Sequence, residues 1–301
     1  MTINSTRDFP LAAGICKNSE KKTILRFENV SFFYRKKIQA LTDINLTFFI
    51  GESIAICGPN GSGKTTLLKM AAGLLCPSAG KVWFYGKELN GATKKTVFRK
   101  IGFLFQDSED QLFCPTVKED IAYGPVNMKL GKDEIEQRVQ YAMEIMQIKH
   151  LANRPIHHLS GGEKKRVALA GLLSMKPPML IMDEPLNGLD VSTARELIKT
   201  FQQLNQDYGY TLIVVTHNID RVPDFAKRII LLKDGTVLRD GDVTEVLTDI
   251  PSLQKSGLEA PIITRYFHWK NLQAGAKTNH LPLSIEEVCK NNGSSLLKGS
   301  A

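Results

Sequence analysis

The chain reads Gly58-Pro59-Asn60-Gly61-Ser62-Gly63-Lys64-Thr65-Thr66 at residues 58–66, which fits the pattern G-x-x-x-x-G-K-[ST]. The apolar run Ser53-Ile54-Ala55-Ile56-Cys57 precedes it and Leu67-Leu68-Lys69-Met70-Ala71-Ala72 follows it, so a strand, a loop and a helix are predicted in that order. Glycines let successive backbone N–H groups point at phosphate oxygens, and the helix N-terminus adds partial positive charge. Lys64 is predicted to reach the β- and γ-phosphates, and the Thr65 hydroxyl to bind Mg²⁺. We therefore predict a site for a nucleoside triphosphate, with a glycine-rich surface turn as the alternative.

Two carboxylates follow an apolar run further along the chain, in Leu180-Ile181-Met182-Asp183-Glu184-Pro185. Such a run is typical of a buried central strand, and open α/β sheets place their ligands at the carboxyl ends of their strands. Asp183 is predicted to hold Mg²⁺, usually through water, and Glu184 to polarise the attacking water. Without a phosphate-binding loop, an Asp-Glu pair of this kind is more often a helix cap or a turn.

A third motif, Leu159-Ser160-Gly161-Gly162-Glu163, precedes the two carboxylates and is called the signature segment below. Ser160 occupies the position of a helix N-cap, Glu163 stands three residues later as in a capping box, and residues 164–174 can continue the helix. The two glycines at the helix start expose N–H donors to an anion, so the segment predicts a second phosphate-binding surface. A simple helix cap is the alternative.

The motifs occur in the order Tyr34, the phosphate loop, Gln106, the signature segment, Asp183-Glu184, Asp190 and His217. From about Arg26 to about Glu245, this order and spacing resemble the ATP-binding-cassette (ABC) ATPases. The resemblance implies the cofactors ATP and Mg²⁺. It also implies a composite site, in which the signature segment of one subunit covers the phosphate loop of its partner.

The same resemblance implies roles for single residues. Tyr34 stacks on adenine, Gln106 senses Mg²⁺ and the transport partner, and His217 contacts the γ-phosphate, so that Gln106 and His217 join Glu184 as catalytic residues. Ser160 and Gly162, with Gly161 between them, grip the γ-phosphate of the partner's nucleotide. Taken singly, each of these residues has another interpretation: a packed tyrosine, a solvated glutamine, an exposed histidine or a helix cap.

A finer resemblance appears in residues 105–113 (FQDSEDQLF), 115–125 (PTVKEDIAYGP) and 257–265 (GLEAPIITR). These segments are similar to the ATPase component of energy-coupling-factor importers, which include cobalt and nickel uptake systems. The resemblance implies three partners: a second ATPase subunit in a homo- or heterodimer, a transmembrane coupling protein, and a substrate-binding membrane component. It implies a peripheral protein on the cytoplasmic face of the cell membrane. The sequence departs from the family pattern at Glu163, at Leu186-Asn187 and at Val191, which leaves the catalytic groups unaffected.

The function implied is an ATP-hydrolysing subunit that powers uptake of a micronutrient, namely cobalt or nickel ions, with vitamins as the alternative. A soluble ABC ATPase that acts on DNA or ribosomes is the rival from another class, but such proteins often carry long coiled-coil insertions or two cassettes, and this sequence has neither. An exporter cassette is disfavoured by residues 109–113. There, Glu109 and Asp110 beside Leu112-Phe113 are predicted to receive an amphipathic helix that carries Arg.

Composition agrees with this interpretation. The net charge of +8 comes from dispersed Lys and Arg without interleaved aromatic residues, so no nucleic-acid partner is expected. A solvated surface accounts for the charge, and attraction to anionic lipid headgroups is the alternative. The five cysteines form no C-x-x-C pair, as expected in a reducing cytosol. No apolar run approaches the roughly 18 residues of a membrane span.

The organisation predicted is an α/β fold of the P-loop NTPase type. Residues 1–22 are expected to be a flexible tail without the features of a secretory signal. Residues 23–245 form the ATP-binding domain, with an antiparallel β edge and a helical subdomain at about residues 107–178 that presents the signature segment. Residues 246–301 form a small C-terminal extension, for which Pro251, Pro261 and Pro282 predict irregular structure.

Overall fold

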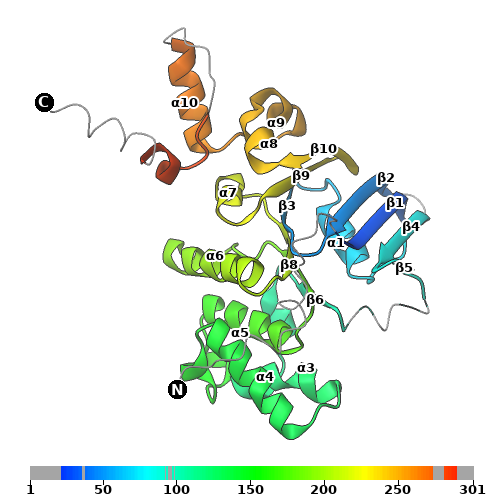
Figure 1. The fold of residues 1–301 in the computed structure, drawn as a ribbon, viewed down its shortest axis with the longest axis vertical. Helices are drawn as coiled ribbons and strands as arrows, with labels where there is room; N and C mark the ends of the chain where they lie inside the picture. Colours follow the sequence, from blue (N-terminus) through cyan, green and yellow to red (C-terminus); the bar gives the residue numbers. More distant parts are fainter. Residues whose placement is uncertain are drawn as a thin grey trace, which may run out of the picture.

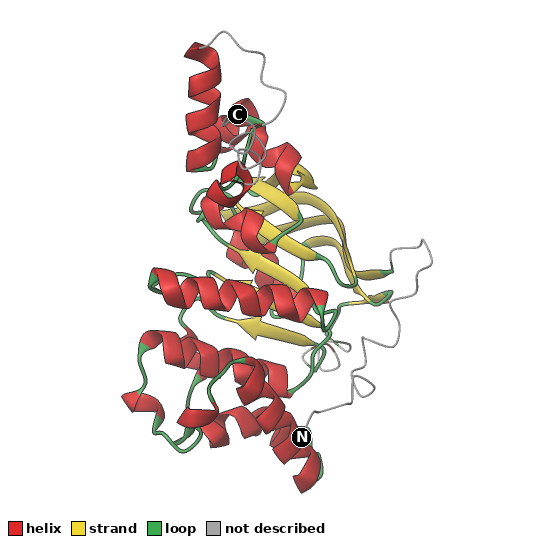
Figure 2. Cartoon of the chain, turned by 60° about the vertical axis from the view of Figure 1, so that its left-hand side comes forward, coloured by secondary structure: helices red, strands yellow, loops and turns green. Residues whose placement is uncertain are grey.

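The computed structural model describes residues 22–35, 38–91, 93, 97, 99–273 and 281–289 (Figure 1). The N-terminal tail expected at residues 1–22 lies outside the described residues, except for Lys22. In the described part of the chain, two sheets lie at the centre and helices pack around them (Figure 2). This arrangement confirms the predicted α/β class. No helix among the described residues has both the length and the apolar composition needed to cross a membrane.

The larger sheet has the strand order β10-β9-β3-β8-β7-β6, in which all neighbours are parallel except β10 and β9. Its strands are β3 (Ser53–Cys57), β6 (Ile101–Leu104), β7 (Met179–Asp183), β8 (Thr211–Val215), β9 (Arg228–Lys233) and β10 (Thr236–Asp242). Every residue of β3, β7 and β8 is buried, as expected for parallel strands that are covered on both faces.

Alternate residues of these strands enter two different hydrophobic cores, because side chains on a strand alternate between its faces. On β3, Ile54 and Ile56 pack with α1 (Lys64–Ala71) and with the smaller sheet. Ala55 and Cys57 pack on the other face with α5 (Gly161–Ser174) and α6 (Val191–Gln206). In Figure 2, the long helix α6 crosses this second face of the sheet.

The smaller sheet is antiparallel, with the order β2-β1-β4-β5, and it confirms the predicted antiparallel edge. Its strands are β1 (Thr23–Tyr34), β2 (Ile38–Phe49), β4 (Ala79–Phe84) and β5 (Lys87–Glu88). Its inner face buries Phe27, Phe48 and Val82 against α1. The phosphate loop therefore lies where the two sheets meet.

The helical region lies at one end of the molecule in Figure 1 and comprises η1 (Ser108–Gln111), α3 (Val117–Asn127), α4 (Lys132–Ile145), η2 (Lys149–Leu151), η3 (Ile156–His158) and α5. The helical pattern predicted at residues 132–146 is confirmed. Val139, Met143 and Met146 are buried in the core, and Ile135 is partly buried against it. These methionines are packing residues, as expected.

The C-terminal extension differs from the sequence expectation. Where irregular chain was predicted after about Glu245, the structure has α8 (Val243–Thr248), α9 (Ile250–Ser256) and α10 (Ile262–Gln273). That expectation was wrong because Pro251 lies in the first turn of α9 and Pro261 immediately precedes α10. Proline is tolerated at a helix start, where its missing N–H has no partner to lose. These helices follow η4 (Ile219–Arg221) and α7 (Val222–Phe225) in the chain.

Candidate nucleotide site

The phosphate loop connects β3 to α1, and its glycines are required by close approach to neighbouring strands. A Cβ atom on Gly58 would lie 2.2 Å from the carbonyl oxygen of Leu232 on β9. One on Gly63, which has a φ of 97°, would lie 2.5 Å from the carbonyl oxygen of Ala40. Larger residues would therefore push the loop away from both sheets. The loop conformation that exposes its N–H groups depends on these two glycines.

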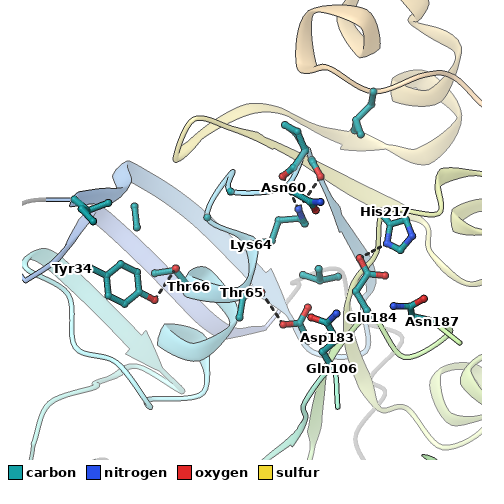
Figure 3. A pocket seen from close by; sticks show the side chains of 18 of the residues that line it. Tyr34, Asn60, Lys64, Thr65, Thr66, Gln106, Asp183, Glu184, Asn187 and His217 are labelled. Carbon is teal, nitrogen blue, oxygen red and sulfur yellow. Dashed lines mark hydrogen bonds and ion pairs between the residues drawn. The ribbon is translucent and has the colours of Figure 1, made fainter. Parts of the chain in front are cut away.

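A cavity of about 750 Å³ lies over this loop. It brings together most of the predicted site, namely Tyr34, Gly58, Pro59, Asn60, Gly61, Gly63, Lys64, Thr65, Thr66, Gln106, Asp183, Glu184 and His217. Tyr34 lies at one end and His217 at the other, with the loop between them (Figure 3). Ser62 belongs to the loop but its side chain is buried, and among the described residues its Oγ has no hydrogen-bond partner.

Lys64 lies inside the loop with its ammonium group close to the backbone. Its Nζ donates to the carbonyl oxygens of Gly58 and Pro59, at 2.8 Å each. Burial lowers the pKa of Lys64, while the nearby carboxylate of Glu184 opposes that shift. A partly desolvated ammonium group makes strong charge-assisted hydrogen bonds to an anion, so this position suits a phosphate.

Thr65 and Asp183 form the part of the cavity that can hold a metal ion. Thr65 Oγ1, at the start of α1, donates to Asp183 Oδ2, at the end of β7, over 2.9 Å. Burial raises the pKa of Asp183, and the hydrogen bond from Thr65 lowers it. A bound divalent cation would favour the charged carboxylate. One carboxylate and one hydroxyl beside a phosphate site are ligands that fit Mg²⁺, which usually completes its shell with phosphate oxygens and waters.

Glu184 has an unusual backbone conformation, with a φ of 50° in the left-handed region. Its N–H donates to the carbonyl of Val215 on the neighbouring strand β8, at 3.0 Å, and its carbonyl accepts from Asn187 N–H, at 3.1 Å. Its Oε1 lies 2.8 Å from Nδ1 of His217. Strained residues of this kind cluster at functional sites, where the surrounding structure holds them in place. The carboxylate faces the His217 ring inside the cavity (Figure 3).

Tyr34 ends β1 and lines the opposite end of the cavity. Its hydroxyl lies 3.1 Å from Thr66 Oγ1, and its ring packs edge-to-face on Phe32 with centroids 4.9 Å apart. The ring is partly exposed, so one aromatic surface remains available beside the loop. This place, at the end of the cavity away from Glu184 and His217, suits the base of a bound nucleotide.

Gln111, a residue that the sequence analysis did not select, holds the chain just before Gln106. The side chain of Gln111 accepts from Phe105 N–H at 3.0 Å and donates to the carbonyl of Phe103 at 2.9 Å. It therefore holds two backbone groups, one of Phe103 and one of Phe105, in the segment that leads to Gln106. The only feature of the sequence that could have pointed to Gln111 is its place within residues 105–113, which resemble the energy-coupling-factor ATPases. Asn187 and Leu258 also line the cavity without having been predicted.

The signature segment forms the predicted capping box. Ser160 N–H donates to Glu163 Oε2 at 2.7 Å, and Glu163 N–H donates to Ser160 Oγ at 3.3 Å. The hydrogen bond from the Ser160 backbone lowers the pKa of Glu163. However, Ser160, Gly161 and Gly162 are not among the described residues that line the nucleotide cavity. The chain therefore does not bring its own signature segment to its own phosphate loop.

Comparison with known proteins fits this geometry. Residues 41–187 match the family described as ABC transporter. The chain is 38% identical to the energy-coupling factor transporter ATP-binding protein EcfA of Methanocaldococcus jannaschii over 274 residues, which cover 89% of this chain and 96% of that protein. The chain belongs to the EcfA family of ABC transporter ATP-binding proteins.

Solved structures extend the match to three dimensions. One is CbiO1 from Clostridium perfringens, described as part of the ABC transporter complex cbiONQ; it is 38% identical, with a TM-score of 0.73 over 84% of this chain and all of that one. The dimeric ABC transporter cassette MJ0796 is 32% identical, with a TM-score of 0.66 over 73% of this chain and 99% of that one. As a member of the EcfA family, the chain is an ATPase that hydrolyses ATP to drive transport.

Proposed function

We propose that this ATPase powers the uptake of cobalt or nickel ions, with vitamins as the alternative cargo. The cargo proposal rests on the resemblance of residues 105–125 and 257–265 to such importers. In this proposal the ATPase works at the cytoplasmic face of the membrane, with a transmembrane coupling protein and a substrate-binding membrane component. Residues 23–245 form the ATP-binding domain, with a helical subdomain at about residues 107–178, and residues 246–301 form the extension.

An uptake assay tests the cargo. Cells that express the ATPase together with its co-purifying membrane proteins are expected to accumulate radiolabelled cobalt or nickel, and Lys64→Ala cells are expected to lose this uptake. Loss of the phosphate-binding ammonium group abolishes the energy supply but leaves the membrane proteins intact. Accumulation of a labelled vitamin instead of either metal ion would contradict the metal proposal while leaving the ATPase role in place.

We propose the following roles in the hydrolysis itself. Lys64 and the N–H groups of the phosphate loop hold the triphosphate, while Thr65, Asp183 and Gln106 hold Mg²⁺, which neutralises phosphate charge when bound. Glu184 accepts the proton of the water that attacks the γ-phosphorus as the bond to the β-phosphate oxygen breaks. Because His217 Nδ1 faces Glu184 at 2.8 Å, its Nε2 is left to reach the γ-phosphate.

We propose that the site is completed by a second ATPase subunit. The observation that carries this proposal is the position of Ser160, Gly161 and Gly162, which lie outside their own chain's cavity although their helix start suits an anion. The dimeric cassette among the related structures supports it. In this arrangement the partner's signature segment grips the γ-phosphate opposite Lys64.

We propose that the transmembrane partner docks beside η1. A cavity of about 430 Å³ is lined there by Gln111, by Leu172 and by Phe113 and Tyr123, whose exposed rings pack edge-to-face at 4.5 Å. The acidic pair expected to receive an Arg is already partly engaged, since Glu109 accepts a hydrogen bond from Lys164 at 2.8 Å. Asp110 and the aromatic pair are therefore the better candidates for the contact.

Replacing Asp110 and Phe113 with alanine is expected to leave ATP binding intact and to reduce co-purification with the transmembrane partner. A partly desolvated Arg-carboxylate pair costs about 2 kcal/mol when one partner is truncated, which is roughly 30-fold in affinity. Leu238→Ala, which removes an exposed apolar side chain from β10, is the control. Unchanged co-purification and uptake of the double variant would place the docking surface elsewhere.

A further inference from the structure

The turn that carries His217 is anchored to the C-terminal extension. Asp220 follows His217 by three residues on η4, and its Oδ1 accepts the N–H of Ile262 at 2.7 Å. Ile262 is the first residue of α10, and Pro261 before it has no N–H. Asp220 therefore caps α10 from 42 residues away in the chain. This contact joins the catalytic turn to a helix outside the predicted ATP-binding domain.

The histidine itself has few other constraints. Its side chain is 61% exposed and contacts the Glu184 carboxylate through Nδ1 at 2.8 Å. The turn is held internally, by Asn218 N–H on Thr216 Oγ1 at 3.1 Å and by Ile219 N–H on the His217 carbonyl at 3.1 Å. The turn is also attached to the sheet, because Thr216 N–H donates to the Ile56 carbonyl of β3 at 3.2 Å and Ile219 is buried in the core. On the side of the turn that faces the C-terminal helices, the bond from Asp220 to Ile262 adds a further anchor.

The linker before α10 runs along the same edge of the site. A second cavity, of about 310 Å³, has the turn residues His217 to Asp220 on one side and Leu258, Glu259, Ala260 and Arg265 on the other. Leu258 also lines the nucleotide cavity. A Cβ on Gly257 would lie 3.9 Å from Pro59 of the phosphate loop, and Lys233 Nζ donates to the Lys255 carbonyl at 2.6 Å. The extension thus borders the nucleotide site at both the loop and the turn.

We propose that Asp220 is a positioning residue for ATP hydrolysis. Through its hydrogen bond to Ile262 N–H it fixes the His217 turn against α10, and it thereby aligns His217 with Glu184. The C-terminal extension consequently sets the rate of hydrolysis from outside the ATP-binding domain. This inference rests on the role proposed above for His217.

Asp220→Ala is expected to lower kcat by about tenfold, since misplacing a catalytic group by about 1 Å can cost up to 10²-fold. KM for ATP should stay within about twofold, because the groups that bind the phosphates are untouched. Asp220→Asn keeps an oxygen acceptor at the same position and is expected to retain most of the activity. Each is measured as steady-state ATP hydrolysis by the full-length chain.

The matched control is Asp242→Ala. Asp242 also caps a helix, α8, by accepting Thr244 N–H at 2.7 Å, but it does not line either cavity. Both alanine variants should lower Tm by a similar amount, whereas only Asp220→Ala should lower kcat. An equal loss of kcat in both variants would show that Asp220 affects hydrolysis only through the stability of the fold, and would contradict the proposal. A fully active Asp220→Ala, or an Asp220→Asn as impaired as the alanine variant, would overturn the proposal.

The hydrogen-bond donor, Ile262 N–H, can be removed independently of Asp220. This second variant tests the proposal even if Asp220→Ala folds poorly. Ile262→Pro deletes the N–H at the first helical position, where proline is tolerated. It should lower kcat as Asp220→Ala does, and combining the two changes should cost no more than either alone, because both break one hydrogen bond. Additive losses would show that the two residues act separately. A His217→Ala variant tests the role of His217 separately. Unaltered hydrolysis by this variant would refute that role, whereas reduced hydrolysis by His217→Ala with full activity of Asp220→Ala would refute only the Asp220 proposal.

Discussion

Glu184→Gln is expected to lower ATP turnover by about 10²-fold or more, while ATP binding is retained and the closed dimer becomes more stable. Glutamine keeps the size of the side chain and an oxygen that can face His217, but an amide cannot accept the proton of the attacking water. The phosphate-binding groups, Lys64 and the loop, are unchanged. Single-turnover hydrolysis and equilibrium nucleotide binding on the same preparation separate the two effects.

Glu196→Gln is the control for this change. Glu196 is an exposed acid on α6 that pairs with Arg166 at 2.5 Å, away from the nucleotide cavity. It is expected to hydrolyse ATP at the normal rate. Normal turnover by Glu184→Gln would remove this residue from the role of general base, and a loss of nucleotide binding would mean that its carboxylate shapes the site instead.

Mixing two inactive variants is expected to restore hydrolysis. Lys64→Ala loses nucleotide binding at its own phosphate loop, because charge-assisted hydrogen bonds to phosphate disappear. Ser160→Arg keeps its own loop but adds bulk at the surface that closes over the partner, and it removes the cap of α5. In a mixed dimer, one site combines the intact loop of the Ser160→Arg chain with the intact signature segment of the Lys64→Ala chain. If half of the dimers are mixed and each site works alone, recovery reaches about a quarter of the normal rate.

The mixture is read as ATPase activity after mixed dimers have been demonstrated with two affinity tags. No recovery in proven mixed dimers would mean that the site is not shared between subunits. Ser160→Ala separates capping from nucleotide contact. If the segment does no more than cap α5, this variant costs about 1 kcal/mol of stability and little activity.

The phosphate loop and the carboxylates were predictable because the residues that act together lie close to one another in the sequence. Gly58 to Thr66 lie within nine residues, and Asp183 ends β7 with Glu184 directly after it, so neighbours in sequence are neighbours in the site. The capping box of Ser160 and Glu163 is local in the same way. The irregular chain expected after Glu245 was wrong because prolines that break a helix interior also begin helices, and only their surroundings distinguish the two cases.

The residues that contact the proposed catalytic groups or the chain beside them were not predictable in this way. Gln111, the last residue of η1, holds the chain before Gln106 through two hydrogen bonds to the backbone, and no sequence pattern predicts such contacts for a single glutamine. The backbone of Glu184 is bonded to β8 and to Asn187, and Asp220 reaches Ile262 across 42 residues. The contacts of Glu184 with β8 and of Asp220 with Ile262 depend on how distant segments pack, and the Gln111 contacts depend on how the chain turns after β6; hydrophobic periodicity encodes neither.

The amino-acid sequence alone predicted a nucleotide site with a phosphate loop and two carboxylates, because each motif is a short run whose residue types suffice for the chemistry, and the order of the motifs showed the resemblance to the ABC ATPases. The tertiary structure decided which of these parts share one cavity and which do not. It placed Glu184 beside His217, left Ser160 outside its own chain's site, and joined the His217 turn to α10. Those relations are distances between segments far apart in the chain, and packing of the two cores against the central sheet sets them.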